Sequence, residues 1–234
     1  MQTTVNTKLF WDIDGTLIDT KGAAATAFSC AVSDFAQKTI TINSKNTGGF
    51  TDYEIAINLL TENKIPFYSG DISKILENYI QRLSTSLSET NLQILNRVDL
   101  VLDNLLNIDS IEVSVGTGNC LSGARLKLEY AELNQFFSET EVFCATENFW
   151  NRELVIQNAK NSLSKDCLGI IIGDTPKDIF SARKCGLSVI SVASGAYSSD
   201  ELITFDPDAI LKGNWEYHEL MQAIDDIKSM KGIT

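Results

Sequence analysis

Short runs of apolar residues recur along this chain, and stretches with helical periodicity separate them. Five of the runs predict strands, at residues 9–11, 110–115, 142–145, 168–172 and 187–192. Several are apolar at every position, which is typical of parallel strands covered on both faces. The helical stretches lie at residues 119–133, 152–163 and 176–185. This alternation predicts an α/β fold built on a doubly wound, mainly parallel sheet.

The interval between the first two predicted strands is much longer than a crossover requires. It holds almost a hundred residues, whereas a parallel crossover needs about a dozen or more. Three helical patterns fill it, at residues 23–35, 52–61 and 73–83. Thr51 and Glu54 form a capping-box signature before the second of them. We therefore expect a small helical domain over residues 20–92, inserted into a core formed by residues 1–19 and 93–234.

Composition and charge narrow the possible partners and the compartment. The 234 residues carry a formal charge of −12, and this negative field disfavours charge-driven binding to nucleic acids or anionic membranes. No apolar run approaches the ~20 residues that span a bilayer, and the N-terminal sequence lacks a signal-peptide pattern. The five cysteines are widely spaced and form no C-x-x-C pair, which is typical of reduced thiols. The sequence predicts a cytoplasmic protein that binds neither nucleic acids nor membranes.

Two carboxylates follow the first predicted strand directly, in the segment Asp12-Ile13-Asp14-Gly15. Ligands of open α/β sheets bind beyond the carboxyl ends of the strands, which is where both acids fall. Two acids separated by one residue suit a nucleophile and a proton donor. The alternative interpretation is a polar Asp-Gly turn without chemistry.

A third acid, Asp174, follows the buried run at residues 168–172. Thr175 fits a helix N-cap with Pro176 at the first helical position, and Asp178 lies in the first turn, where it can complete the cap. Asp174 precedes the cap and has no evident structural duty. Together with Asp12 and Asp14 it forms an oxygen-rich site for a hard cation, and Mg²⁺ fits such a ligand set.

Phosphate-binding groups are predicted after the strand at residues 110–115. There Thr117 stands between two glycines and precedes Gly118 and Asn119, so that hydroxyl and backbone donors can meet a phosphate. Arg152, at the start of a helix, and Lys127, inside the preceding helix, are the candidate cations. We favour Arg152, because Lys127 lies more than two turns into its helix, where a solvated surface charge is the ordinary interpretation.

In this order, the segments resemble the haloacid dehalogenase superfamily of phosphohydrolases, and the resemblance spans about residues 8–211. Four segments carry it: Asp12-Ile13-Asp14-Gly15-Thr16, Thr117-Gly118-Asn119, residues 124–128, and Gly173-Asp174 with Asp178. The segment Gly48-Gly49-x-Thr51-Asp52 is similar to the inserted helical cap, of the C1 type, in phosphoglycolate-phosphatase-like members. The resemblance implies a Rossmann-like core with a cap, and a Mg²⁺-dependent phosphatase acting on a small phosphate monoester.

The resemblance also implies a role for each site residue. Asp12 attacks phosphorus and forms an aspartyl-phosphate, while Asp14 protonates the leaving alkoxide and then activates water. Mg²⁺ is held by Asp12, the Asp14 carbonyl and Asp174, while Asp178 supports the metal shell or orients the cation. Phosphate contacts come from Thr117, Gly118, Asn119 and a cation, and the loop with Gly49 contacts the rest of the substrate.

The chain departs from the family pattern at two places. Arg152-Glu153 stands where members usually carry a lysine, often followed by proline, and residues 95–98 lack a Pro-Gly pair. A phosphomutase of the β-phosphoglucomutase type is an alternative, but such enzymes carry valine at the position of Thr16. Asp14 disfavours haloacid or phosphonate chemistry. A non-catalytic binding protein on the same fold is the alternative from a different class. The substrate and the oligomeric state are not predicted.

Overall fold

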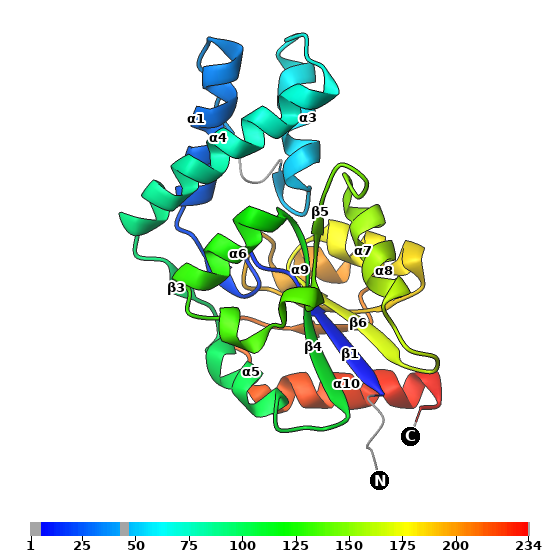
Figure 1. The fold of residues 1–234 in the computed structure, drawn as a ribbon. Helices are drawn as coiled ribbons and strands as arrows, with labels where there is room; N and C mark the ends of the chain where they lie inside the picture. Colours follow the sequence, from blue (N-terminus) through cyan, green and yellow to red (C-terminus); the bar gives the residue numbers. More distant parts are fainter. Residues whose placement is uncertain (1–5, 43–46, 234) are drawn as a thin grey trace.

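The computed structural model describes residues 6–42 and 47–233, and it is built on a six-stranded parallel sheet (Figure 1). From one edge to the other, the strands are β5 (Val142–Ala145), β4 (Ile111–Cys120), β1 (Thr7–Trp11), β6 (Leu168–Gly173), β7 (Ser188–Val192) and β8 (Ala209–Leu211). Both neighbours of β1 pair with it in parallel. The predicted α/β fold with a parallel sheet is confirmed.

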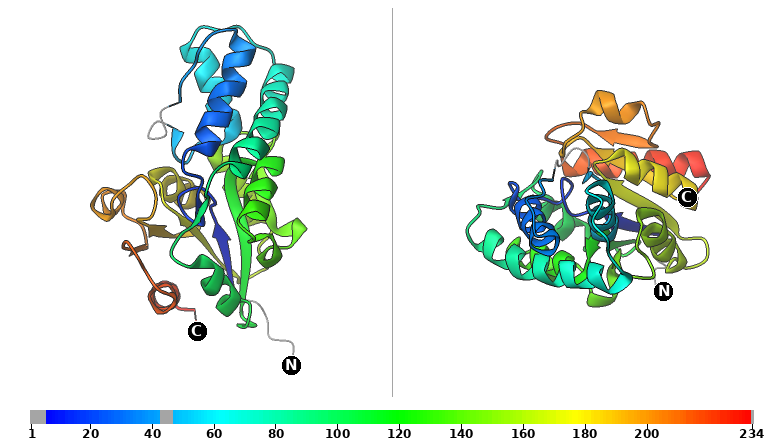
Figure 2. Two further views of the ribbon diagram at one scale, coloured as in Figure 1. Left: turned by 90° about the vertical axis from the view of Figure 1, so that its left-hand side faces the viewer. Right: turned by 90° about the horizontal axis from the view of Figure 1, so that it is seen from above.

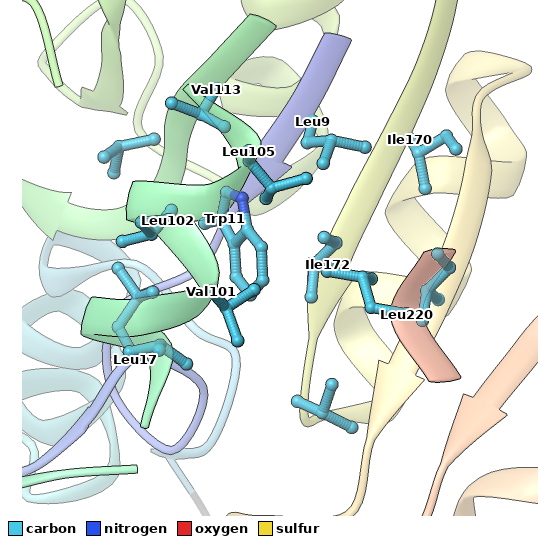
Figure 3. Packing of buried hydrophobic residues seen from close by; sticks show 14 of the residues in the cluster. Leu9, Trp11, Leu17, Val101, Leu102, Leu105, Val113, Ile170, Ile172 and Leu220 are labelled. Atoms are coloured by element: carbon cyan, nitrogen blue, oxygen red, sulfur yellow. The ribbon is translucent and has the colours of Figure 1, made fainter. Parts of the chain in front are cut away.

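Helices cover both faces of the sheet, because alternate side chains of the central strand point to opposite sides. Leu9 and Trp11 belong to the cluster formed with α5 (Val98–Leu105), α6 (Leu121–Tyr130) and α10 (Tyr217–Lys231). Phe10 belongs to the cluster with α7 (Arg152–Asn161), α8 (Pro176–Cys185) and α9 (Ser199–Ile203). Figure 3 shows the first cluster, where Leu102 and Leu105 of α5 lie beside Trp11. Because helices cover both faces, the carboxyl ends of the strands are left as the edge at which the candidate residues lie.

Three further helices stand beyond that edge, away from both termini (Figures 1 and 2). They are α1 (Ala23–Ala36), α3 (Asp52–Glu62) and α4 (Ser69–Ser88). Their apolar side chains pack in one cluster, which also includes Cys120 at the end of β4 and in which Phe28 and Tyr79 lie 4.7 Å apart between ring centroids. A short antiparallel pair, β2 (Ile18–Asp19) and β3 (Gln93–Ile94), joins this helical unit to the sheet at both ends.

Several predicted boundaries were wrong, among them the end of β4 and both ends of α4 (Ser69–Ser88). This strand extends to Cys120 instead of ending at residue 115, because its glycine-rich end keeps pairing with β5 through an irregular step between Gly116 and Cys120. The following helix therefore begins at Leu121 rather than at residue 119. The helix predicted at residues 73–83 runs over Ser69–Ser88. The capping box of Thr51 and Glu54 is confirmed.

Across the described parts of the chain, no helix combines the length and the apolar character that crossing a membrane requires.

Candidate active site

Three buried carboxylates meet at the carboxyl edge of the sheet, where the neighbouring strands β1 and β6 end. Asp12 follows β1, Asp174 follows β6, and Asp178 lies in the first turn of α8. Each offers an oxygen, and these oxygens lie within 4.8 Å of one another. The structure thus brings Asp12 together with two acids that follow it by 162 and 166 residues, as the positions of Asp12 and Asp174 after parallel strands predicted.

Electrostatics favour a cation between these acids. Burial raises the pKa of Asp12 to about 6, with Asp178 and Asp14 adding to the rise and Arg152 opposing it. Burial and the neighbouring charges of Asp178 and Asp12 also raise the pKa of Asp174. Oδ1 of Asp12 is buried and accepts no hydrogen bond from any described residue. An orphaned oxygen beside a second buried carboxylate is the ligand set that a hard divalent cation such as Mg²⁺ accepts.

The surroundings of Asp174 leave no room for other side chains. A Cβ atom on Gly15 or on Gly195 would overlap the carboxylate of Asp174. Thr16 donates a hydrogen bond of 3.1 Å to Asp174 Oδ1, and Ser194 donates one of 2.8 Å to the carbonyl of Gly15. The loop after β7 thus packs against the loop after β1, and the two loops together restrict the orientation of the Asp174 carboxylate. The sequence analysis missed this loop, although a Ser194-Gly195 pair after a buried strand was a usable signal.

Arg152 is the cation beside Asp12. It begins α7 and is 1% exposed, and its Nη2 lies 2.5 Å from Asp178 Oδ1 and 3.4 Å from Asp12 Oδ2. Although burial alone lowers its pKa, Asp12 and Asp178 raise it, so the guanidinium stays charged. Its Nη1 is buried and has no partner among the described residues. Arg152 therefore lies beside Asp12 and keeps one guanidinium nitrogen without a partner among the described residues.

Asp178 holds this arginine in place and also caps α8. Its Oδ1 accepts from Nε of Arg152 at 3.0 Å, besides Nη2. Its Oδ2 accepts from the amide and the hydroxyl of Thr175, at 3.1 and 2.6 Å. The cap that the sequence predicted for Thr175 is present. Because both oxygens of Asp178 are engaged, its present contacts orient the cation, which is one of the two roles that the resemblance implied.

Lys127 is buried, and its interpretation as a solvated surface charge was wrong. It is 2% exposed, because its position on α6 lies on the same face as the core residues Ala124 and Leu128. Its Nζ donates to Asp14 Oδ2 and to Asn119 Oδ1, both at 2.6 Å. The side-chain nitrogen Nδ2 of Asn119 donates to the same Asp14 oxygen at 2.8 Å. The two candidate cations thus serve different acids: Arg152 faces Asp12, and Lys127 faces Asp14.

The end of β4 supplies the predicted phosphate-binding segment. Thr117 is fully buried, and its Oγ1 accepts from the backbone and side-chain nitrogens of Asn119, at 3.3 and 2.8 Å. A Cβ atom on Gly118 would lie 2.6 Å from the carbonyl oxygen of Phe50, so only glycine fits against the loop from the helical unit. Gly118 and Asn119 line the cavity described next, whereas Thr117 lies behind them.

A cavity of about 420 Å³ lies between the carboxyl edge of the sheet and the three further helices. The core lines it with Asp12, Asp14, Asn119, Lys127, Arg152 and Asp174. The helical unit lines it with Gly49 and, unexpectedly, with Asp52, which is the first residue of α3. Burial raises the pKa of Asp52 to about 6, while Lys127 and the hydrogen bond from the Cys120 amide, at 2.8 Å, lower it.

The start of α3 is attached to the core by several polar contacts. The hydroxyl of Thr51 donates to the carbonyl of Trp150. Glu54 accepts from Lys177 Nζ at 2.7 Å and from the amide of Arg152 at 3.3 Å, while it also completes the capping box. Lys177 lies over the ring of Phe50 as well, 3.6 Å from its centroid. The helical unit therefore closes one side of the cavity in this structure.

The sequence around these site residues matches a known protein family. The family model described as haloacid dehalogenase-like hydrolase matches residues 9–192, which contain the carboxylates of both strands, both buried cations and the β4 segment. The chain belongs to the haloacid dehalogenase-like hydrolase family. The resemblance inferred from the sequence motifs is thereby confirmed. No curated protein matches this haloacid dehalogenase-like chain.

Solved structures of similar fold support the same architecture. A predicted phosphatase from Clostridium acetobutylicum is 18% identical, with a TM-score of 0.72 over 95% of this chain and 100% of that one. A predicted phosphoglycolate phosphatase from Haemophilus somnus is 16% identical, with a TM-score of 0.63 over 94% and 97%. CbbY from Rhodobacter sphaeroides, solved in complex with phosphate, is 15% identical, with a TM-score of 0.71 over 93% and 98%. At identities of 15–18%, these similarities show that the three proteins and this chain share a fold.

Proposed function

We propose that this chain is a Mg²⁺-dependent phosphatase that hydrolyses a small phosphate monoester through an aspartyl-phosphate on Asp12. One observation carries the proposal. The buried Oδ1 of Asp12 and the buried Nη1 of Arg152 are both unpartnered among the described residues, and both residues line one cavity. A nucleophilic oxygen beside a free cationic donor is the arrangement that an incoming phosphoryl group requires.

The reaction divides between the two aspartates. A carboxylate oxygen of Asp12 attacks phosphorus, the bond from phosphorus to the ester oxygen breaks, and Asp14 gives a proton to the leaving alkoxide. Water then attacks phosphorus, Asp14 takes the proton of that water, and inorganic phosphate leaves while Asp12 is regenerated. Arg152 and Gly118 hold the phosphoryl oxygens, where positioning and charge stabilisation do most of the work. The N–H groups of Asn119 donate to Thr117 and Asp14 and so shape this end of the cavity.

Asp12 and Asp174 are the side chains that would hold Mg²⁺, with the Asp14 carbonyl as a third ligand. The raised pKa values of both carboxylates and the free oxygen of Asp12 fit this assignment. The bound ion supplies charge neutralisation between the anionic nucleophile and the anionic phosphate. Asp178 belongs to the same cluster and contributes by holding Arg152.

Residues 20–92 act in this proposal as a cap over the active site. Their helices pack mainly on one another, and they meet the core through polar contacts of Thr51, Asp52 and Glu54 and through apolar packing on Cys120 and Leu126. A cap excludes water from the phosphoryl group and presents its own side chains to the alcohol portion of the substrate. The loop with Gly49 fits closely against Thr175 and Lys177, since a Cβ atom on Gly49 would overlap the hydroxyl of Thr175.

The test is hydrolysis of p-nitrophenyl phosphate by the wild type with Mg²⁺, with EDTA, and by Asp12→Asn. We expect turnover that requires Mg²⁺ and that falls by about 10³-fold or more in Asp12→Asn, because the amide cannot act as nucleophile. Mass spectrometry of acid-quenched Asp14→Asn should then find phosphate on Asp12, since the second step lacks its base.

Asp225→Asn is the matched control, because Asp225 is an exposed carboxylate on α10, at the opposite end of the sheet. It should retain wild-type turnover. Hydrolysis that survives in Asp12→Asn, or that proceeds undiminished in EDTA, would contradict the proposal. If p-nitrophenyl phosphate is not turned over, a panel of metabolite phosphates read by phosphate release takes its place, with the same variants.

A further inference from the structure

The wall that the helical unit contributes to the cavity combines apolar side chains with the hydroxyl residues Thr20 and Thr47, and it carries one carboxylate. Phe28, Ile42, Ile55 and Tyr79 line it, and the first and last of these form the aromatic pair of α1 and α4. Among the described residues 20–42 and 47–92, Asp52 is the one charged side chain that lines the cavity. A ligand that enters this part therefore meets apolar and hydroxyl-bearing side chains and a single negative charge.

Both cations that line the cavity are already assigned to the core. Lys127 donates to Asp14 and Asn119, and Arg152 pairs with Asp178 and Asp12. They are the lysine and the arginine found among the cavity-lining residues in the described part of the chain. Under the proposed function, Arg152 faces the transferred phosphoryl group, while Lys127 stays hydrogen-bonded to Asp14 and Asn119. A second anionic group on the substrate would thus find no cationic partner at the cap wall.

Asp52 is a buried carboxylate at the cavity wall and not a solvated surface charge. It is 6% exposed, and its Oδ2 accepts from the Cys120 amide at 2.8 Å, which fixes its direction at the start of α6. A carboxylate has about four acceptor positions on its two oxygens, so the backbone amide and the thiol of Cys120 together leave acceptor capacity on a residue that lines the cavity.

We propose that Asp52 selects phosphate monoesters whose alcohol portion carries a hydrogen-bond donor, an ammonium or a hydroxyl group, and that the site rejects esters with a second anion. This inference rests on the proposed function and specifies its substrate class. The donor meets Asp52, the apolar part of the alcohol packs on the cap wall, and the phosphate lies at Asp12 and Arg152. An anion placed near Asp52 would face a like charge in a desolvated site, at a large cost. Phosphoglycolate, whose alcohol portion ends in a carboxylate, is therefore expected to be a poor substrate.

The experiment compares three benzyl phosphates that differ only in the para substituent: aminomethyl, hydroxymethyl or carboxylate. The ring fits the apolar wall, and the leaving oxygens are alike because the ring separates them from the substituent. Binding is measured by calorimetry in Mg²⁺ with Asp12→Asn, so that no turnover is needed. We expect the amine and the alcohol to bind about tenfold or more tightly than the carboxylate. In the wild type, kcat/KM should follow the same order.

Asp52→Asn, introduced into the Asp12→Asn protein, should reduce the ratio of amine to carboxylate binding about tenfold, because the amide still accepts from Cys120 but carries no charge. Glu77→Gln is the matched control, since Glu77 is exposed on α4 and loses the same charge; its ratio should not change. Ala25→Lys adds an ammonium to the lining on α1 and should favour the carboxylate ester. If the Asp52 variant fails to fold, Ala25→Lys still tests the inference, because a lack of any shift toward the carboxylate ester would contradict it.

The inference is overturned if the carboxylate ester binds as well as the other two, or if the ratio survives unchanged in Asp52→Asn. Its failure can be distinguished from failure of the proposed function. Mg²⁺-dependent hydrolysis of p-nitrophenyl phosphate together with a preference for the carboxylate ester would reject the inference alone. Absence of hydrolysis with every ester, while the predicted order of binding holds, would reject the proposed function alone.

Discussion

Lys127 and Asp14 are joined by a hydrogen bond of 2.6 Å between Nζ and Oδ2, although 113 residues separate them in the chain. Lys127 is almost completely buried, whereas the side chain of Asp14 keeps 42% of its surface exposed toward the cavity. Asn119 donates to the same oxygen of Asp14. One oxygen is thus held by two donors, which leaves the other to face a substrate. Lys127 therefore positions the proposed acid and base of the reaction.

Replacing Lys127 by methionine should affect poor leaving groups most. We expect kcat/KM for an alkyl phosphate to fall about 10²-fold or more, in the range of a general acid contribution. The loss with p-nitrophenyl phosphate should be smaller, because p-nitrophenolate leaves without a proton. Comparing the two esters in the wild type, Lys127→Met and Lys127→Arg provides the measurement. An equal loss with both esters would mean that Lys127 is only structural.

Removing the charge of Arg152 should destabilise the fold as well as abolish activity. Arg152→Met leaves the buried carboxylates of Asp12 and Asp178 without their cation, and loss of one partner of a buried ion pair costs about 3–5 kcal/mol. Arg152→Lys keeps the charge but loses the forked contact with Asp178, so the loss of stability should be smaller. Urea unfolding of the three proteins measures this, and equal stability of Arg152→Met and the wild type would contradict the prediction.

Substituting Gly195 should weaken Mg²⁺ binding. The added Cβ atom of Gly195→Ala would overlap the carboxylate of Asp174, so that Asp174 must turn away from its position beside Asp12. We expect the Mg²⁺ concentration for half-maximal rate to rise about tenfold, an effect typical of groups that orient a ligand. Mg²⁺ should also raise the melting temperature of the wild type more than that of the variant. An unchanged Mg²⁺ requirement would show that Asp174 is not a ligand.

Asp52 should make stability depend on pH. Burial raises the pKa of Asp52 to about 6 from its ordinary value of 3.8, so the folded protein binds this proton more tightly than the unfolded chain. The stabilising contribution of the protonated form is complete below the unfolded pKa and is lost as the pH rises through 6. Relative to the wild type, Asp52→Asn should thus gain about 1–2 kcal/mol between pH 5 and pH 8. Urea unfolding at both pH values measures this gain; a constant difference would contradict the shift.

The sequence predicted those parts of the site that follow from local rules. Asp12 and Asp174 were recognisable because each follows a buried apolar run, and the cap at Thr175 followed from its spacing to Asp178. Lys127 was misjudged, although Ala124 and Leu128 lie on the same face of its helix and indicated burial. Its partner Asp14 could not be inferred, since their contact depends on how α6 packs against the loop after β1.

Asp52 illustrates the same limit for the helical unit. Its position after Thr51 was read as part of the start of a helix, and that local interpretation is correct. Its hydrogen bond with Cys120 and its place in the cavity depend on how two distant parts of the chain meet. The end of β4 was misplaced for a similar reason, because its extended conformation comes from pairing with β5 rather than from its own residues.

The two-stranded ribbon of β2 and β3 connects the helical unit to the loop of the proposed reacting groups over only a few hydrogen-bonded residues. Ile18 begins β2 only four residues after Asp14, and the amide of Gly15 donates to the carbonyl of Ile18 at 2.8 Å. The amide of Leu95, just after β3, donates to the carbonyl of Leu17 at 3.0 Å. Entry to and exit from the helical unit are therefore fastened to the same short loop that carries Asp14. A tilt of the helices about this ribbon would therefore be transmitted directly to the loop that carries Asp14.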